Sequence, residues 1–247
     1  GEDHLASVAG VELRDDGELF CFVDPDILAT GPWVPPLIAS LSEHQAVTSG
    51  KELWADDNVR PTEHPGVNGE FFFDADGFTF GSPHLAIYRR AALQDTCSRW
   101  QIGFGSSGND LPPEARQRLV DAGRGYWVYD TGKVVNILLQ LDGRPLEHRE
   151  VDTLLHVGWV SHFLAPPSTA PAAVGKPVRW GEGAEWTEDP RLQARHGLAR
   201  YTAAAMHDLA TGRPAPEPPP NADPALVPRY LAVRRALEGL QHHRVPD

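Results

Sequence analysis

The first strongly apolar segment of the chain is the run Leu19-Phe-Cys-Phe-Val23, which is short, continuous and rich in aromatic and branched side chains. This pattern is typical of a strand that is covered on both faces of an α/β sheet. The run ends at Asp24-Pro25-Asp26. Because proline donates no backbone hydrogen bond and fixes its own φ, the sequence predicts that the strand stops here and that the chain turns at the carboxyl edge of the sheet.

The rest of the chain alternates between patterns that favour helices and patterns that favour strands. Asp76-Gly77 lies between two aromatic runs and predicts a β-hairpin over residues 70–80, and this turn, rather than a metal site, accounts for Asp74 and Asp76. Helices are expected over residues 5–13, 35–41, 113–122, 131–141, 191–209 and 225–243, and further strands at 46–48 and within 146–155.

These elements predict one α/β domain with a helical extension. Residues 1–164 are expected to form a mixed, mainly parallel sheet flanked by helices, and residues 165–247 a C-terminal extension with proline-rich linkers at 166–171 and 213–224. The last helix has an apolar side, which consists of Leu226, Tyr230, Val233 and Leu237. We expect the extension to pack on the domain or on another subunit, so that self-association through these helices is a further expectation.

Composition and charge narrow the class of protein. The 247 residues carry a formal net charge of −12, which argues against nucleic acid or an anionic membrane surface as a partner. The longest apolar runs fall far short of the roughly 20 residues that span a bilayer, and no segment resembles a signal peptide, so a cytoplasmic location is expected. Cys21 and Cys97 lack metal-ligand spacing and are expected to be buried or inert thiols.

Asp24 and Asp26 are the first candidates for chemistry. Residues i and i+2 of an extended segment point the same way, so both carboxylates can face one space. Such oxygens suit Mg²⁺ or Mn²⁺ holding a diphosphate, and a cation would offset the repulsion between an acidic protein and an anionic nucleotide. The alternative interpretation is a polar turn that follows a buried strand.

Four segments between about residues 18 and 163 indicate a family of proteins through the order in which they follow one another. They are Asp24-Pro-Asp26 with Gly31-Pro-Trp33, Ser82-Pro-His-Leu-Ala-Ile-Tyr88-Arg-Arg, Tyr129-Asp-Thr-Gly-Lys133 and His156-Val-Gly-Trp-Val-Ser161. In this order they resemble the metal-binding, acceptor-side, catalytic-base and late His-x-Gly segments of family 2-like glycosyltransferases with the GT-A fold.

The resemblance implies a metal-dependent inverting glycosyltransferase that moves a sugar from a nucleotide diphosphate sugar to a hydroxyl of a small-molecule or glycan acceptor. Mg²⁺ or Mn²⁺ held by Asp24, Asp26 and His156 would neutralise the leaving diphosphate. Asp130 would take the proton of the acceptor hydroxyl. The resemblance also implies donor contacts by Asp24, Ser161 and His162.

Acceptor contacts are implied for Trp33, His84, Tyr88 and Arg89. Several of these residues have a structural alternative. Tyr88 suits strand packing, and Trp33 suits a place over the core as well as a sugar ring. Asp130 can cap a helix that begins at Thr131, and His156 can be a buried, hydrogen-bonded imidazole.

In the GT-A fold, a longer strand-helix-strand segment that binds the base and ribose precedes the Asp-x-Asp, whereas only Gly1 to Val23 precede it here. The resemblance therefore implies that this nucleotide-binding part lies outside the printed sequence, or that the base is held by other residues.

Two other classes of protein remain as alternatives. An aspartate-based phosphohydrolase would use Asp24 as its nucleophile, but it would have Thr or Val two residues after Asp26, where this chain has Leu28. A non-catalytic protein that binds a sugar nucleotide on the same fold, or a scaffold that binds a partner through its C-terminal helices, is the third class. Turnover of a nucleotide sugar separates the enzyme from this third class.

Overall fold

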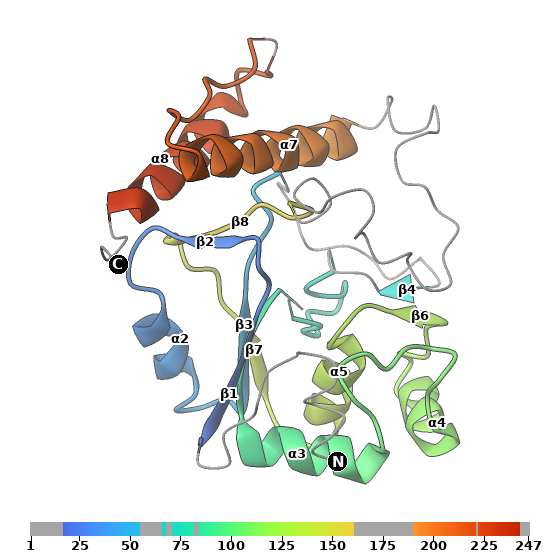
Figure 1. Ribbon diagram of the computed structural model, residues 1–247. Coiled ribbons are helices and arrows are strands. Elements are labelled where there is room, and N and C mark those ends of the chain that lie inside the picture. Colours follow the sequence, from blue (N-terminus) through green and yellow to red (C-terminus); the bar gives the residue numbers. More distant parts are fainter. Residues whose placement is uncertain are drawn as a thin grey trace. The chain divides into compact units, whose positions relative to one another are not determined.

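The computed structural model describes residues 17–54, 66–67, 71–81, 84–160, 190–220 and 222–242 (Figure 1). The chain divides into two compact units that interleave along the sequence. The first, here called the sheet unit, comprises Gly1–Asp24, Trp33–Lys51 and Asp57–Val151. The second, here called the helical unit, comprises Pro25–Pro32, Glu52–Asp56 and Asp152–Asp247.

Several expectations fall outside the described residues and stay predictions. They are the helix at 5–13, the linker at 166–171 and the domain boundary between residues 164 and 165.

A four-stranded sheet lies in the sheet unit, with the strand order β1-β5-β3-β7. Its strands are β1 Leu19–Val23, β5 Leu85–Arg89, β3 Ala46–Ser49 and β7 Leu146–His148. β5 pairs antiparallel with both β1 and β3, whereas β3 and β7 pair parallel. The α/β class with a mixed sheet is therefore confirmed, but the expectation of a mainly parallel sheet is wrong. An apolar run predicts a buried strand without reporting the direction of its neighbours.

β1 lies at one edge of this sheet, and within the described residues it pairs with β5 alone. Phe20 is its one buried residue, while Leu19 and Val23 are 37% and 44% exposed. The strand and its end before Asp24 are confirmed, but the predicted burial on both faces is wrong. Burial depends on how many neighbouring strands and helices cover the strand, which its own sequence does not contain.

The described helices of the sheet unit are α2 Val34–Ser40, α3 Arg90–Trp100, α4 Pro113–Asp121 and α5 Lys133–Leu141. Residues 133–139 of α5 are all buried, and they include the polar residues Lys133 and Asn136. α5 begins at Lys133 rather than at the expected Thr131, because Gly132 occupies the N-cap position with a φ of 78°. A short parallel pair joins β4 Gly66–Val67 to β6 Val128–Tyr129.

The aromatic segment 71–81 forms the predicted hairpin turn, with Phe73 and Thr79 paired antiparallel. Asp74 organises the turn, because its Oδ1 accepts the backbone N–H groups of Asp76 at 2.9 Å and of Phe78 at 2.8 Å. These bonds confirm that the turn accounts for this second Asp-x-Asp.

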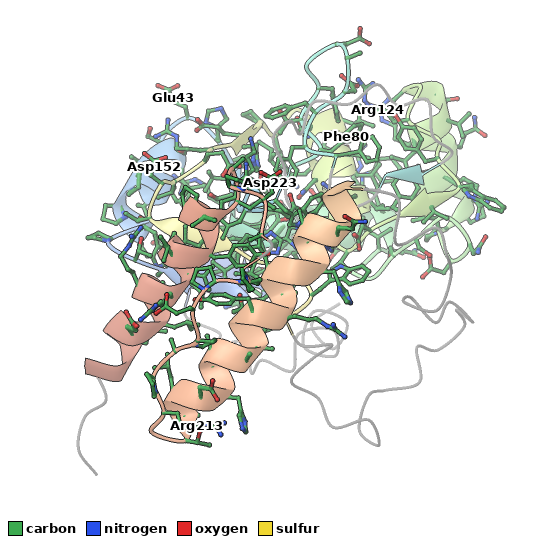
Figure 2. All side chains as sticks on the ribbon, turned by 90° about the horizontal axis from the view of Figure 1, so that it is seen from above. Glu43, Phe80, Arg124, Asp152, Arg213 and Asp223 are labelled. Atoms are coloured by element: carbon green, nitrogen blue, oxygen red, sulfur yellow. The ribbon has the colours of Figure 1, made fainter. Side chains whose placement is uncertain are left out.

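Side chains from elsewhere in the sheet unit hold the hairpin in place. The guanidinium of Arg124, which is labelled near Phe80 in Figure 2, donates to Asp74 Oδ2 at 3.0 Å. Lys133 is fully buried, and its ammonium donates to the carbonyl oxygen of Phe71 at 2.6 Å and to that of Gly81. The first residue of α5 therefore binds both ends of the hairpin.

Gly81 is the position in this region where a side chain is least tolerable. Its φ is +71°, and an added Cβ would lie 2.8 Å from Thr48 Oγ1. Gly77 offers a matched control, because its φ is +80° but no atom of the described residues would lie within 4 Å of its Cβ. We expect Gly77→Ala to lower the free energy of unfolding by about 1–2 kcal/mol through backbone strain alone. Gly81→Ala should cost roughly 1–3 kcal/mol more because it also overpacks the core. Urea unfolding of both variants measures the difference, and equal losses would contradict the close packing at Gly81.

The helical unit joins a short antiparallel strand pair to two long helices. Its elements are β2 Ile27–Ala29, β8 Leu154–His156, α7 Pro190–Ala210 and α8 Val227–His242. Tyr201 of α7 and Tyr230 of α8 meet edge to face, with ring centroids 5.1 Å apart. The four residues expected on the apolar side of the last helix are in or against the core of this unit, which confirms that prediction: Leu226, Tyr230, Val233 and Leu237.

Among the described residues, no helix has both the length and the apolar character needed to cross a bilayer.

Candidate functional site

Asp24 and His84 form a carboxylate–imidazole pair in the sheet unit. The antiparallel register of β1 and β5 ends at Val23 opposite Leu85, and the N–H of Asp24 then donates to the carbonyl oxygen of His84 at 2.7 Å. This backbone bond places the two side chains next to each other, with His84 Nδ1 2.8 Å from Asp24 Oδ2. An ionised carboxylate only accepts hydrogen bonds, so His84 Nδ1 carries the proton. The Nε2 atom of a neutral His84 ring would then bind a metal ion or accept a hydrogen bond from a ligand.

Asp26 and His156 form a second pair, in the helical unit. His156 is the last residue of β8 and lies opposite Ile27 of β2, and the N–H of Val157 donates to the carbonyl oxygen of Asp26 at 3.1 Å. His156 Nε2 lies 3.5 Å from Asp26 Oδ1, and the two side chains are 2% and 10% exposed. The predicted proximity of His156 to the acidic motif is therefore confirmed for Asp26.

The separation in this second pair fits two ligands of one cation. It exceeds the usual 2.7–3.2 Å range of a hydrogen bond. Oxygen and nitrogen ligands at about 2.1 Å from an ion lie about 3 Å apart at a right angle and about 3.5 Å apart at a tetrahedral angle. The observed 3.5 Å lies at the upper end of this range, so Asp26 Oδ1 and His156 Nε2 can share an ion with little movement.

Glu52 adds a buried carboxylate beside this pair, and the sequence did not indicate it. Glu52 is 2% exposed and forms a parallel bridge with His156, while the N–H of Leu53 donates to the carbonyl oxygen of His156 at 2.9 Å. Residues paired across a ladder extend their side chains from the same face. Residues 51–67 are polar and contain Pro and Gly, so the sequence predicts only an irregular loop there, and the long-range bridge to β8 leaves no local signal.

The sequence predicts that the strands before Asp24 and His156 end at the same sheet edge, but β1 and β8 lie in different sheets. β8 pairs with β2, the strand that follows Asp26, and the two form a separate two-stranded sheet. Three-residue strands are too short for a hydrophobic pattern to predict, so the expectation merged β7 and β8 into one segment.

Asp130 is exposed and lies directly after β6. Its Oδ1 accepts the N–H of the next residue, Thr131, at 2.8 Å. It does not cap α5, because that helix begins two residues later than expected and its N-cap is Gly132. The helix-cap interpretation is thus wrong, while the role of Asp130 as a base stays a prediction.

The residues expected on the acceptor side have different surroundings. Tyr88 is 1% exposed, and its hydroxyl donates to Asn136 Oδ1 at 2.6 Å. Burial raises the pKa of Tyr88 far above its usual range, and the packing alternative accounts for this residue. Arg89 donates to the carbonyl oxygen of Leu41 at 2.7 Å, and Trp33 is half-buried at the start of α2. The expected donor residues Ser161 and His162 lie outside the described residues.

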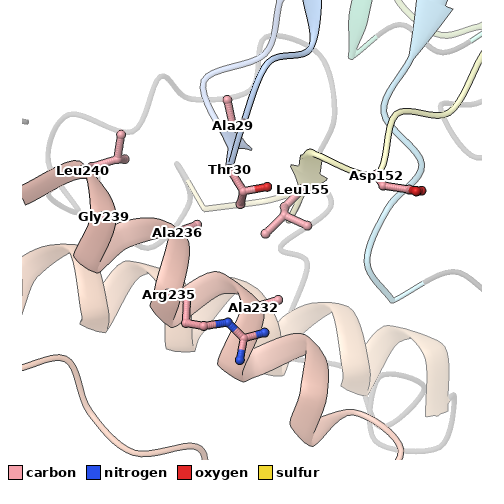
Figure 3. Close-up of a pocket in the computed structure, with 10 residues that line it drawn as sticks. Ala29, Thr30, Asp152, Leu155, Ala232, Arg235, Ala236, Gly239 and Leu240 are labelled. Atoms are coloured by element: carbon pink, nitrogen blue, oxygen red, sulfur yellow. The ribbon is translucent and has the colours of Figure 1, made fainter. Parts of the chain in front are cut away.

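A cavity of about 640 Å³ opens within the helical unit, where the end of β2 faces α8 (Figure 3). Small residues of α8, namely Ala232, Ala236 and Gly239, make one wall, and the segment from Ala29 to Gly31 makes another. This segment begins three residues after Asp26, so one short strand connects the Asp26–His156 pair to a hollow large enough for a small molecule.

Comparison with protein-family models, with curated proteins and with solved structures finds no match for this chain.

Proposed function

We propose that this protein is a metal-dependent inverting glycosyltransferase of the GT-A type, which moves a sugar from a nucleotide diphosphate sugar to an acceptor hydroxyl. The observation that carries the proposal is the pair of Asp26 with the buried His156, whose 3.5 Å separation suits two ligands of one cation. The acidic charge of the chain supports a metal in this role, because a cation is then needed to hold an anionic donor.

The cation supplies the charge that the reaction needs. Asp26 and His156 would hold Mg²⁺ or Mn²⁺, and the cation would offset the negative charge that develops on the diphosphate as the sugar leaves. Asp24 is two residues away along the chain, and covalent geometry alone limits the distance between the Cα atoms of Asp24 and Asp26 to about 7 Å. Asp24 would orient the same ion or contact the donor ribose, as the resemblance implies.

The acceptor side of the reaction needs a base and a group that positions the hydroxyl. Asp130 is the proposed base, since an exposed carboxylate can take a proton from a bound hydroxyl. His84, whose ring is fixed by Asp24, is proposed to bind the acceptor or the donor sugar through Nε2.

Thermal unfolding in the presence of nucleotide diphosphates tests the proposal. A ligand that binds only the folded protein raises its Tm, so at least one of UDP, GDP, ADP, CDP and dTDP should raise the Tm by about 2 °C or more in millimolar MnCl₂ or MgCl₂. The same nucleotide should have no effect in EDTA. Stabilisation by a nucleotide in the absence of a metal would indicate a nucleotide-binding protein that needs no cation. If no nucleotide raises the Tm, the proposal is contradicted.

A further inference from the structure

The segment that follows β8 has an unusual backbone. Gly158 and Trp159 both have positive φ values, of 74° and 64°. Glycine accepts this conformation, but a bulky side chain such as that of Trp159 rarely does, and such residues persist only where their surroundings hold them. The surroundings of residues 158–159 therefore hold this backbone in place.

Arg195 of α7 is part of these surroundings. Its guanidinium carbon lies 4.3 Å from the ring centroid of Trp159 and 5.1 Å from that of Trp54, distances at which a cation is attracted to an indole face. The two rings fix the guanidinium, so its N–H groups have a defined direction.

Three nitrogen donors converge on the space beside Gly158. A Cβ added to Gly158 would lie 3.7 Å from Arg195 Nε, 3.8 Å from Trp54 Nε1 and 3.9 Å from Arg195 Nη2. Apart from the chain neighbours of Gly158, these are the nearest atoms among the described residues, and at these distances an atom the size of an oxygen would not clash with them. Any residue other than glycine at position 158 would occupy this space itself.

The indole N–H of Trp54 indicates that a hydrogen-bond acceptor occupies this space. Trp54 is 3% exposed, and its indole N–H has no hydrogen-bond acceptor among the described residues. Buried N–H groups nearly always have an acceptor, because leaving one unsatisfied costs free energy. The missing partner must be an acceptor rather than a donor, and the neighbouring guanidinium favours a negatively charged one.

We propose that Trp54, Gly158 and Arg195 form a binding site for a tetrahedral oxyanion, such as a phosphoryl group of a ligand. The guanidinium offers the parallel Nε and Nη2 donors that bind two oxygens of one anion. The indole N–H approaches from a separate residue and suits a third oxygen, which a phosphate has and a carboxylate lacks. Gly158 lies two residues after His156, but the anion site contains none of the proposed metal ligands. The proposal therefore does not depend on whether an ion binds Asp26.

Titration of metal-free wild-type protein with inorganic phosphate tests this site. Trp54 and Trp159 contact the guanidinium, so phosphate should change the tryptophan fluorescence in EDTA at constant ionic strength, and acetate should bind more weakly. Trp54→Phe keeps an aromatic ring but removes the N–H donor, and Arg195→Lys keeps the charge but loses the paired donors. Each variant should weaken phosphate binding about tenfold or more, as for loss of a hydrogen bond to a charged group.

Two exposed residues give matched controls. Trp127→Phe alters a residue that is 70% exposed, and Arg213→Gln alters a side chain that is 57% exposed and that Figure 2 labels after the end of α7. Both should leave phosphate affinity within about twofold of wild type. Phosphate that fails to bind at millimolar concentration, or that binds equally to Trp54→Phe, Arg195→Lys and wild type, would overturn the proposal. Acetate binding as tightly as phosphate would overturn the tetrahedral preference.

Discussion

Asp26→Asn is expected to abolish the metal-dependent binding of nucleotide diphosphates, with a loss of affinity for Mn²⁺ of at least about 100-fold. An amide is a weaker ligand than a carboxylate and leaves the charge of the cation uncompensated. The shape of the side chain is nearly unchanged, and the backbone bond from Val157 to the carbonyl oxygen of Asp26 does not depend on it. The variant should therefore fold normally, and calorimetric titration with MnCl₂ measures its affinity directly.

Asp121→Asn is the matched control for this change. Asp121 is an exposed aspartate at the end of α4, where its Oδ1 accepts a hydrogen bond from Gln117 at 2.7 Å. The Asp121→Asn variant should bind Mn²⁺ with the affinity of the wild-type protein. If Asp26→Asn also keeps wild-type affinity for the metal and for every nucleotide that binds, Asp26 is not a ligand.

Asp130→Asn is expected to reduce sugar transfer by roughly 100-fold or more, while donor affinity stays near that of wild type. A base must accept a proton, which an amide does not do. The structure makes this test cleaner than the sequence alone suggested, because Asp130 does not cap α5. Both Asp130→Asn and Asp130→Ala should therefore unfold within about 0.5 kcal/mol of wild type, as exposed substitutions usually do.

Steady-state kinetics and urea unfolding of these two variants separate the roles. A pair of variants that unfold like wild type and transfer slowly supports a base at position 130. Transfer by Asp130→Asn at nearly the wild-type rate would place the base on another carboxylate.

Local chemistry predicted the features that depend on a few consecutive residues. The end of β1 followed from Pro25, and the hairpin turn followed from Asp76-Gly77 between aromatic residues. The apolar side of α8 also followed from spacing alone, because each helical turn repeats the same face.

Features that depend on distant partners could not be predicted in this way. Among the described strands, β1 pairs with β5 alone, and the residues of β1 themselves do not report how many strands lie beside it. β2 and β8 have three residues each, and their pairing places His156 opposite Ile27 through a register that neither strand encodes alone. The proximity of Asp26 and His156 was therefore predicted correctly, but His156 follows from the pairing of β2 with β8 and not from the sheet that contains β1.

The same limit explains the residues that the sequence missed. Glu52 and Trp54 lie in a segment whose polarity predicted only a loop, yet both are nearly fully buried. Arg195 lies in the helix predicted over residues 191–209, and its contact with two tryptophans exists only in the folded helical unit. Burial by tertiary contacts gives such residues their chemical role, and no nearby residue signals it.

Electron spin echo spectroscopy of bound Mn²⁺ tests the central claim most directly, because it detects nitrogen nuclei that coordinate the ion. The account predicts one tightly bound Mn²⁺ with the nitrogen modulation of an imidazole ligand, and the loss of that modulation in His156→Gln. Absence of a bound ion in the wild-type protein, or an imidazole signal that survives in His156→Gln, would contradict a metal site built on Asp26 and His156.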